Sequence, residues 1–430
     1  MTGPAKPAKG AYFIVAMLFF FMFVNFADKA ILGLTAVPMM KELNLTPKEF
    51  GLVGSSFFLL FSISTIVVGF LVNRIQAKWA LFVMSLIWAL AQFPILGTTG
   101  LATLIASRIV LGAGEGPAYP VAVHAAYKWF PDEKRAVPTA FIAQGASIGV
   151  IIALPALGWV VTHYSWRWAY GVLGVVGLVW CVAWAIFGRE GELPVTVKAQ
   201  SGRVIDRVSY WRLIFNPTIL GNIIASFGAY WGLSLLVAWF TPYLEAGLGI
   251  EASHAHLISA LPWAVSALFV IFISWFSQRL MLRGVTTRLA RGVLAGACVT
   301  VGGLALVTMP YVDWLPLKVA LVVIGISVPS AIYVLGPAVI SEITPPTQRG
   351  ALLAINNATV TTAGLIAPFA TGSAIQNAAT PAAGYVYGFF VCGIITLVGG
   401  LIGMIFIRPA AEIRRFEADA RAAPQAAAAE

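Results

Sequence analysis

Four ionisable residues lie inside long apolar stretches of the sequence, where a charged side chain needs a partner or water. They are Asp28, Lys29, Arg108 and Glu115. An Asp, Lys or Arg at the centre of a membrane helix costs about 2.5–3.5 kcal/mol on insertion scales, so such a residue persists where it pairs or faces a wet cavity. Two of the four are cations and two are anions, so their formal charges cancel. Carboxylates in this setting can exchange protons, and a cation can hold an organic anion.

The composition indicates that these residues belong to a membrane protein. Of the 430 residues, 60% are hydrophobic and 10% are charged, whereas soluble proteins are about half apolar and a quarter charged. The apolar runs are too long for barrel strands and predict transmembrane helices. Twelve spans are predicted near 12–37, 50–72, 79–97, 101–125, 137–161, 168–187, 217–244, 256–278, 291–309, 317–340, 350–375 and 384–407.

Basic residues set the expected orientation. Most of the 27 Lys and Arg residues fall on the N-terminus, the tail and every second loop, and the loops of the other side hold only Lys41, Lys48, Arg167 and Lys318. Cytoplasmic loops are enriched in Lys and Arg, so both termini are predicted to be cytoplasmic. The net charge of +10 is explained in this way, without a nucleic-acid partner.

The predicted domain organisation is two halves of six helices. Residues 1–187 form the first half and 217–407 the second, joined by a polar cytoplasmic linker at 188–216 and followed by an Ala-rich cytoplasmic tail at 408–430. The expected fold is therefore an all-α polytopic membrane protein with twelve transmembrane helices. Large soluble domains do not fit within this division.

The loop between spans two and three carries a recognisable motif. It reads Gly69-Phe-Leu-Val-Asn73-Arg74-Ile-Gln-Ala-Lys78, and Arg279 stands at the equivalent place in the second half. The segment resembles the major facilitator superfamily motif Gly-x-Leu-x-Asp-Arg-x-Gly-x-Lys/Arg, with Asn73 in place of the usual Asp. The resemblance implies two halves that pack around a central cavity and rock about a site near the membrane midplane.

Spans one and four resemble one family within this superfamily, the anion:cation symporters. Asn25-Phe-Ala-Asp28-Lys29 is similar to that family's Asn-Tyr-x-Asp-Arg segment. The sequence Arg108-Ile-Val-Leu-Gly-Ala-Gly-Glu115-Gly-Pro-Ala-Tyr-Pro is similar to its Arg-x-x-x-Gly-x-Gly-Glu-x-x-x-x-Pro segment. The family includes bacterial importers that couple protons to sugar acids and other organic acids.

The resemblance implies a role for each charged residue. Asp28 and Glu115 would take part in proton coupling, and Arg108 would pair with Asp28 as an ion-pair gate. Lys29 would face the anionic substrate, and Asn25, one helical turn earlier, would be a further substrate-binding residue. Lys29 replaces the family's usual Arg, so a point charge stands in place of a bidentate carboxylate clamp. The alternative interpretation is a purely structural ion-pair lock between spans one and four.

Three amides inside spans are further candidates, because a buried amide needs a hydrogen-bond partner. Gln144 in span five lies beside Gly145, where helices can approach closely, and either contacts substrate or bonds a neighbouring helix. Asn356 and Asn357 in span eleven precede Pro368. The resemblance favours Asn357 over Asn356 as a substrate contact.

The predicted function is a secondary active transporter in the bacterial inner membrane that imports an organic anion with protons. The anion would be a carboxylate such as a sugar acid, an aromatic acid or a small organic acid. We expect a monomer in the lipid bilayer, with no cofactor and no metal, since His254, His256 and Glu251 are too few for a metal site. A sodium-coupled, exchanging or exporting carrier is the alternative, and a membrane-embedded enzyme or receptor is a more distant one.

Overall fold

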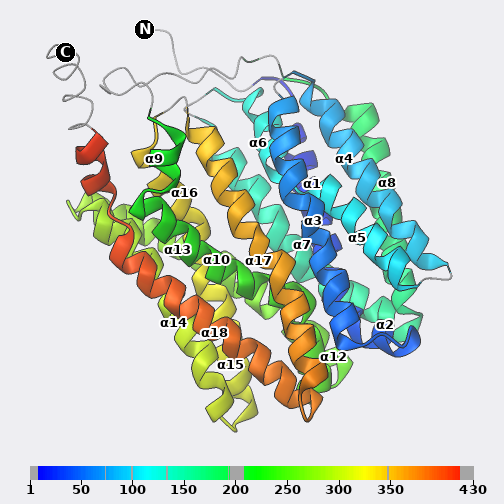
Figure 1. Cartoon of the computed structure of the whole chain (residues 1–430). Helices are drawn as coiled ribbons and strands as arrows, with labels where there is room; N and C mark the ends of the chain where they lie inside the picture. Colours follow the sequence, from blue (N-terminus) through cyan, green and yellow to red (C-terminus); the bar gives the residue numbers. More distant parts are fainter. Residues whose placement is uncertain are drawn as a thin grey trace, which may run out of the picture. The chain divides into compact units, whose positions relative to one another are not determined.

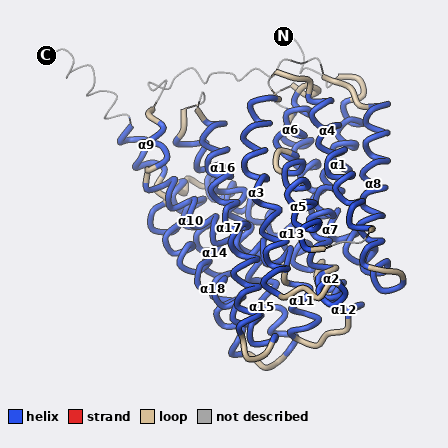
Figure 2. Tube along the Cα trace, turned by 45° about the vertical axis from the view of Figure 1, so that its right-hand side comes forward, coloured by secondary structure: helices blue, strands red, loops and turns tan. Residues whose placement is uncertain are grey.

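The computed structural model describes residues 8–72, 74–97, 100–131, 134–191, 193, 208–345 and 348–416. The motif residue Asn73, most of the predicted 188–216 linker and the tail beyond Phe416 lie outside the described residues. Figure 2 shows that the described chain consists of helices and loops, with no strand among these residues.

The helices of the first part of the chain follow the predicted apolar runs. They are α1 (Ala11–Leu34), α2 (Ala36–Glu42), α3 (Pro47–Leu71), α4 (Ala77–Gln92), η1 (Phe93–Leu96), α5 (Leu101–Glu115), α6 (Ala118–Tyr127), α7 (Ala136–His163) and α8 (Trp166–Phe187). α3 begins with a capping box, in which the side chains of Thr46 and Glu49 satisfy each other's backbone N–H groups.

The second part of the chain is equally helical. Its helices are α9 (Tyr210–Ile214), α10 (Pro217–Ala238), α11 (Phe240–Pro242), η3 (Tyr243–Gly247), α12 (Ala252–Ile258), α13 (Leu261–Leu282), η4 (Arg288–Val293), α14 (Leu294–Thr308), η5 (Met309–Tyr311), α15 (Leu315–Ser327), η6 (Val328–Ala331), α16 (Ile332–Ile343), α17 (Arg349–Asn377) and α18 (Pro381–Phe406).

Eleven helical segments among the described residues are long and apolar enough to cross a membrane. The predicted span at 101–125 is not one of them, because two shorter helices, α5 and α6, form it. Pro117 has no N–H to donate and therefore interrupts the ladder of helical hydrogen bonds there. Gly116 lies so close to α3 that a Cβ on it would collide with the carbonyl oxygen of Phe61. The sequence pattern predicts the apolar run correctly but not this break.

The chain forms two compact units. Unit 1 comprises Met1–Thr196, Ser234–Ala264 and Gly364–Gly388, and unit 2 comprises Val197–Leu233, Val265–Ala363 and Phe389–Glu430. Unit 1 thus contains the whole predicted first half together with two segments of the predicted second half.

Helix pairs in unit 1 pack closely along their length. α1 packs against α7, α3 against α5 and α4 against α8 (Figure 1). Gly149 of α7 allows the close packing of α1 against α7, since a Cβ on this residue would lie 2.5 Å from the carbonyl oxygen of Phe23 in α1. Gly112 of α5 is placed in the same way against Phe57 of α3. Small residues at such crossings let helix backbones approach, and the predicted close approach around span five is confirmed.

The two second-half segments of unit 1 pack against the helix ends that the charge pattern predicts to be external. A Cβ on Gly33 would lie 2.5 Å from the carbonyl oxygen of Val237, and a Cβ on Gly51 would collide with that of Pro368. The backbone N–H of Phe369 donates to the hydroxyl of Ser55 at 3.1 Å. These contacts join α1 and α3 to the segments around residues 234–264 and 364–388.

Unit 2 is built around α10, α14, α16 and α18. One apolar cluster joins Ala225 and Ala229 of α10 to Val299 of α14 and Leu335 of α16. Gly303 of α14 lies against the backbone of α18, where a Cβ would meet Leu397. A second cluster lies at the helix ends near α9 and includes Leu213, Ile219, Ile340, Ile343, Leu352 and Phe416.

Candidate functional site

Lys29 of α1 lies between two polar groups of unit 1. Its ammonium nitrogen donates to the side-chain oxygen of Asn25, one helical turn earlier, at 2.6 Å. The same nitrogen lies 3.4 Å from a carboxylate oxygen of Glu115 at the end of α5. The Lys29 side chain retains 14% of its accessible surface, whereas the Glu115 side chain is fully buried. The structure thus brings together three of the predicted site residues.

Two aromatic rings complete the surroundings of this cation. The Lys29 nitrogen lies 4.2 Å from the ring centroid of Phe26 and 5.5 Å from that of Phe61. Ring faces attract cations at such distances. Phe26, which stands where the symporter motif has Tyr, therefore contacts the cation through its ring instead of a hydroxyl.

Arg108 of α5 is held by groups that the sequence motif does not include. Its Nη2 donates to the hydroxyl of Tyr170 of α8 at 2.8 Å, and that hydroxyl lies 3.0 Å from the hydroxyl of Thr35. Its Nη1 donates to the main-chain carbonyl of Asp28 at 3.4 Å. The sequence analysis did not predict that Tyr170 and Thr35 belong to this site. Their signal in the sequence is a hydroxyl group within or beside an apolar run, which many other residues share.

The predicted ion pair between Asp28 and Arg108 is not formed in this structure. The two residues lie at the same depth, as expected, but the guanidinium contacts the backbone of Asp28 and not its carboxylate. The Asp28 side chain is buried, with 1% of its surface exposed, and neither carboxylate oxygen forms a hydrogen bond of normal geometry with another residue that the structure describes. The ion pair that forms within this group of four residues joins Lys29 to the carboxylate of Glu115. The gating role of Asp28 and Arg108 stays a prediction.

The predicted amides differ in their environments. In unit 2, Asn356 of α17 is buried and accepts a hydrogen bond from the amide of Asn222 of α10 at 3.1 Å. Asn357, the preferred candidate, is exposed, and Gln144 of α7 is half-buried. Asn222 was not predicted as a site residue. Its signal in the sequence is an amide within the apolar run that forms α10, and the structure shows that this amide is fully buried.

A family model described as the Major Facilitator Superfamily matches residues 18–328. The chain belongs to this superfamily. A second family model, described as "Sugar (and other) transporter", matches residues 291–420 of this chain. The chain is accordingly a multi-pass membrane transporter and not an enzyme, as the sequence analysis predicts.

Similar proteins in the superfamily carry names that describe anion transport. The chain is 26% identical over 419 residues to a hexuronate transporter of Bacillus subtilis, with 92% of this chain and 94% of that protein covered. It is 25% identical over 324 residues to a D-galactonate transporter of Escherichia coli, with 69% and 75% covered.

Solved structures support the fold. A bacterial homologue of the human lysosomal transporter Spinster, described as inward-facing and unoccupied, superposes with a TM-score of 0.77 at 17% identity, covering 95% of this chain and 99% of that one. A D-xylose–proton symporter superposes with a TM-score of 0.73 at 17% identity, covering 93% and 99%. At this identity the likeness shows the superfamily fold alone.

Proposed function

We propose that the chain is a secondary active transporter that imports an organic anion together with protons by alternating access. The observation that carries the proposal is the position of the Lys29 nitrogen, 2.6 Å from Asn25 and 3.4 Å from Glu115. A cation with a small exposed fraction, next to a buried carboxylate, is suited to exchange that carboxylate for a substrate carboxylate. The relatives named for D-galactonate and hexuronate make sugar acids the first substrates to test.

Charge balance couples the proton to the anion in this proposal. Without substrate, Glu115 neutralises Lys29. A proton on Glu115 removes its negative charge and leaves Lys29 with an uncompensated charge, which then favours the carboxylate of an incoming anion. One proton and one monovalent anion leave the net charge of the site unchanged. Each ligand therefore strengthens the binding of the other, as reciprocal linkage requires.

Asp28 supplies a second proton-binding group in the proposal. Its buried carboxylate forms no hydrogen bond of normal geometry with the other described residues, and burial away from water favours the neutral, protonated form of a carboxylate. Arg108 would shift from the Asp28 carbonyl to the Asp28 carboxylate in another state of the cycle, which forms the proposed ion-pair gate. Asn357 and Gln144 remain proposed substrate contacts through their amides.

Alternating access would use the contacts at one end of unit 1. We propose that the packing of Gly33 against Val237 and of Gly51 against Pro368 closes the external side of the carrier. These contacts would part when the site opens outward. The proposal places both termini in the cytoplasm, the chain as a monomer in the inner membrane, and the basic loops on the cytoplasmic side.

Transport in sealed proteoliposomes tests the proposal. Purified protein should accumulate a radiolabelled sugar acid when the outside is acidic and sodium is absent, and dissipating the pH gradient should stop accumulation. Aromatic acids and small dicarboxylates serve as comparison substrates, and Lys29→Gln is the inactive control. Accumulation that requires a sodium gradient, or exchange without net uptake, would contradict proton symport.

A further inference from the structure

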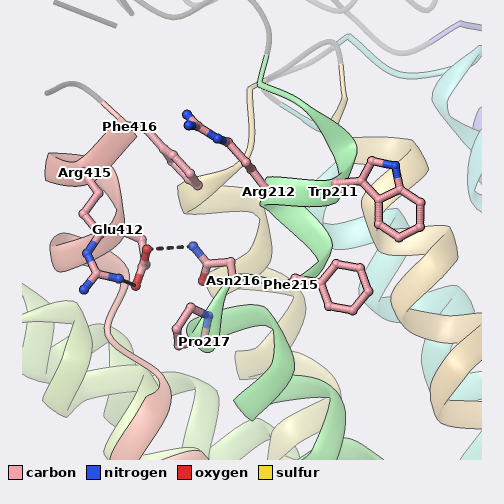
Figure 3. Close-up of a pocket in the computed structure, with 8 residues that line it drawn as sticks. All are labelled: Trp211, Arg212, Phe215, Asn216, Pro217, Glu412, Arg415 and Phe416. Carbon is pink, nitrogen blue, oxygen red and sulfur yellow. Dashed lines mark hydrogen bonds and ion pairs between the residues drawn. The ribbon is translucent and has the colours of Figure 1, made fainter. Parts of the chain in front are cut away.

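A pocket of about 550 Å³ lies where two membrane helices of unit 2 end. α10 begins at Pro217 and α18 ends at Phe406. The short helix α9 precedes the first, and helical residues 409–416 follow the second. The pocket is lined by Trp211, Arg212, Phe215, Asn216, Pro217, Glu412, Arg415 and Phe416 (Figure 3). Its place at the ends of two spans puts it at the level of the membrane interface, on the side predicted to be cytoplasmic.

The walls of the pocket are fixed by apolar packing and hydrogen bonds. Leu213 of α9 and Phe416 are both buried in the apolar cluster at the helix ends. Across the pocket, the amide of Asn216 donates to the carboxylate of Glu412 at 2.8 Å. Nη1 of Arg415 lies 3.2 Å from the other oxygen of the same carboxylate. The acidic group of the pocket is therefore already neutralised by its own neighbours.

The exposed side of α9 has the residues of an interfacial surface. Trp211 and Phe215 expose 71% and 59% of their surface, and their rings stack with centroids 5.4 Å apart. Aromatic residues concentrate at the boundary between lipid and water. Farther along α18, the apolar side chains of Leu401 and Ile405 are also exposed, which provides a surface for acyl chains next to the pocket.

Positive charge surrounds the opening. Arg212 and Arg415 come from opposite walls (Figure 3), and both are exposed. Arg408 and Arg414 add two exposed cations on the segment after α18. Arg415 pairs with Glu412, and the other three arginines leave the described part of this surface with an excess of positive charge that complements a phosphate.

We propose that this pocket binds the phosphate head group of an anionic phospholipid in the cytoplasmic leaflet. Arg212 contacts the phosphate, the Trp211–Phe215 pair contacts the glycerol region, and the acyl chains lie along α18. Basic pockets beside transmembrane helices bind anionic head groups in this way, and guanidinium groups donate paired hydrogen bonds to phosphate oxygens. The pocket is built from residues of unit 2, whereas Lys29 and Glu115 belong to unit 1, and its occupancy can be measured without any transport.

Native mass spectrometry of the purified full chain tests this site. The detergent-solubilised protein is titrated with phosphatidylglycerol or with phosphatidylcholine of the same acyl length. Phosphatidylglycerol should bind more tightly, and Arg212→Gln should weaken it about five-fold, the factor expected for one arginine at an anionic membrane surface. Trp211→Ala should also weaken it, and its exposed side chain makes misfolding a minor concern. Phosphatidylcholine binding should not respond to Arg212→Gln.

The matched control is Arg283→Gln, which removes an exposed arginine from the loop after α13 and should leave phosphatidylglycerol binding unchanged. Equal loss in Arg212→Gln and Arg283→Gln would overturn the site in favour of diffuse charge attraction. Unchanged binding in both Arg212→Gln and Trp211→Ala would overturn it as well. Displacement of phosphatidylglycerol by equimolar inorganic phosphate would identify a soluble-anion site and contradict the lipid assignment.

Discussion

The ammonium nitrogen of Lys29 lies 3.4 Å from a carboxylate oxygen of Glu115. This pair joins the residue proposed to bind the anion to a residue proposed to bind the proton. Because one cation cannot be fully committed to two carboxylates, substrate and deprotonated Glu115 compete for Lys29. The competition supplies a direct physical route for coupling, and it requires no contact between substrate and Glu115 itself.

Replacement of Lys29 by Gln should weaken recognition of the anion. A hydrogen bond to a charged group contributes about 1.5–3 kcal/mol, so carboxylate binding should weaken about ten- to a hundred-fold. The measurement is the ligand-induced rise in thermal stability of purified protein. Lys41→Gln, at an exposed lysine, is the control. A response of Lys29→Gln within a few-fold of the parent protein would refute the assignment.

Replacement of Tyr170 by Phe should destabilise the protein through Arg108. The hydroxyl of Tyr170 accepts a 2.8 Å hydrogen bond from this buried guanidinium. A buried group that loses its partner costs about 1–3 kcal/mol, so the apparent melting temperature in detergent should fall by several degrees. Tyr164→Phe is the matched control, because Tyr164 is 69% exposed. Equal melting temperatures for both variants would show that the hydroxyl does not support Arg108.

Glu42 should make stability depend on pH in the acidic range. Hydrogen bonds from Trp166 and then Arg167 lower the pKa of its carboxyl below the usual value. The pKa of Glu42 is lower in the folded state than in the unfolded state. Ionised Glu42 therefore adds to the free energy of unfolding above the unfolded-state pKa, and this contribution is lost as the pH falls through the folded-state pKa. About half of the side chain is exposed, with 48% accessible, so the effect should stay below about 1 kcal/mol. Melting curves of the parent protein and Glu42→Gln should differ at neutral pH and converge in acid; a constant difference would contradict the prediction.

A methyl group on Gly51 should open the proposed external closure. Its Cβ would collide with the Pro368 carbonyl, whereas a Cβ on Gly350 meets nothing within 4 Å. In a background without the three native cysteines, a Ser55→Cys probe should react slowly with a membrane-impermeant thiol reagent, since Ser55 is 2% exposed. Gly51→Ala should raise external labelling several-fold and Gly350→Ala should not. Unchanged labelling in Gly51→Ala would argue against closure at this point.

The sequence alone predicts that Asp28 and Arg108 are buried and how deep they lie, but it does not predict the burial of Glu412 in the tail. Asp28 and Arg108 lie at one depth in the structure, as residue counting along two apolar runs predicts. Counting does not give the rotation of one helix about its axis relative to another, and this rotation decides that Lys29 meets Glu115. The hydroxyl of Tyr170 that holds Arg108 comes from a third helix, whose placement depends on packing contacts that a single sequence does not encode locally.

The same limit applies to the amides and to the broken span. Asn222 and Asn356 are far apart in sequence, and only the three-dimensional structure shows that they share a hydrogen bond. The break between α5 and α6 has a local signal in Pro117, but the apolar run continues across it. Hydropathy therefore predicts one span, whereas the structure has two helices that meet at Gly116 and Pro117.

Transport by Glu115→Gln in sodium-free proteoliposomes tests the central claim most directly. The variant mimics a permanently protonated Glu115, so it should fail to accumulate the anion under an inward pH gradient. It should retain at least part of the counterflow exchange, which needs no net proton movement, because Lys29 is then available to the substrate. Accumulation equal to that of the parent protein under the same pH gradient would contradict the role of Glu115 in coupling.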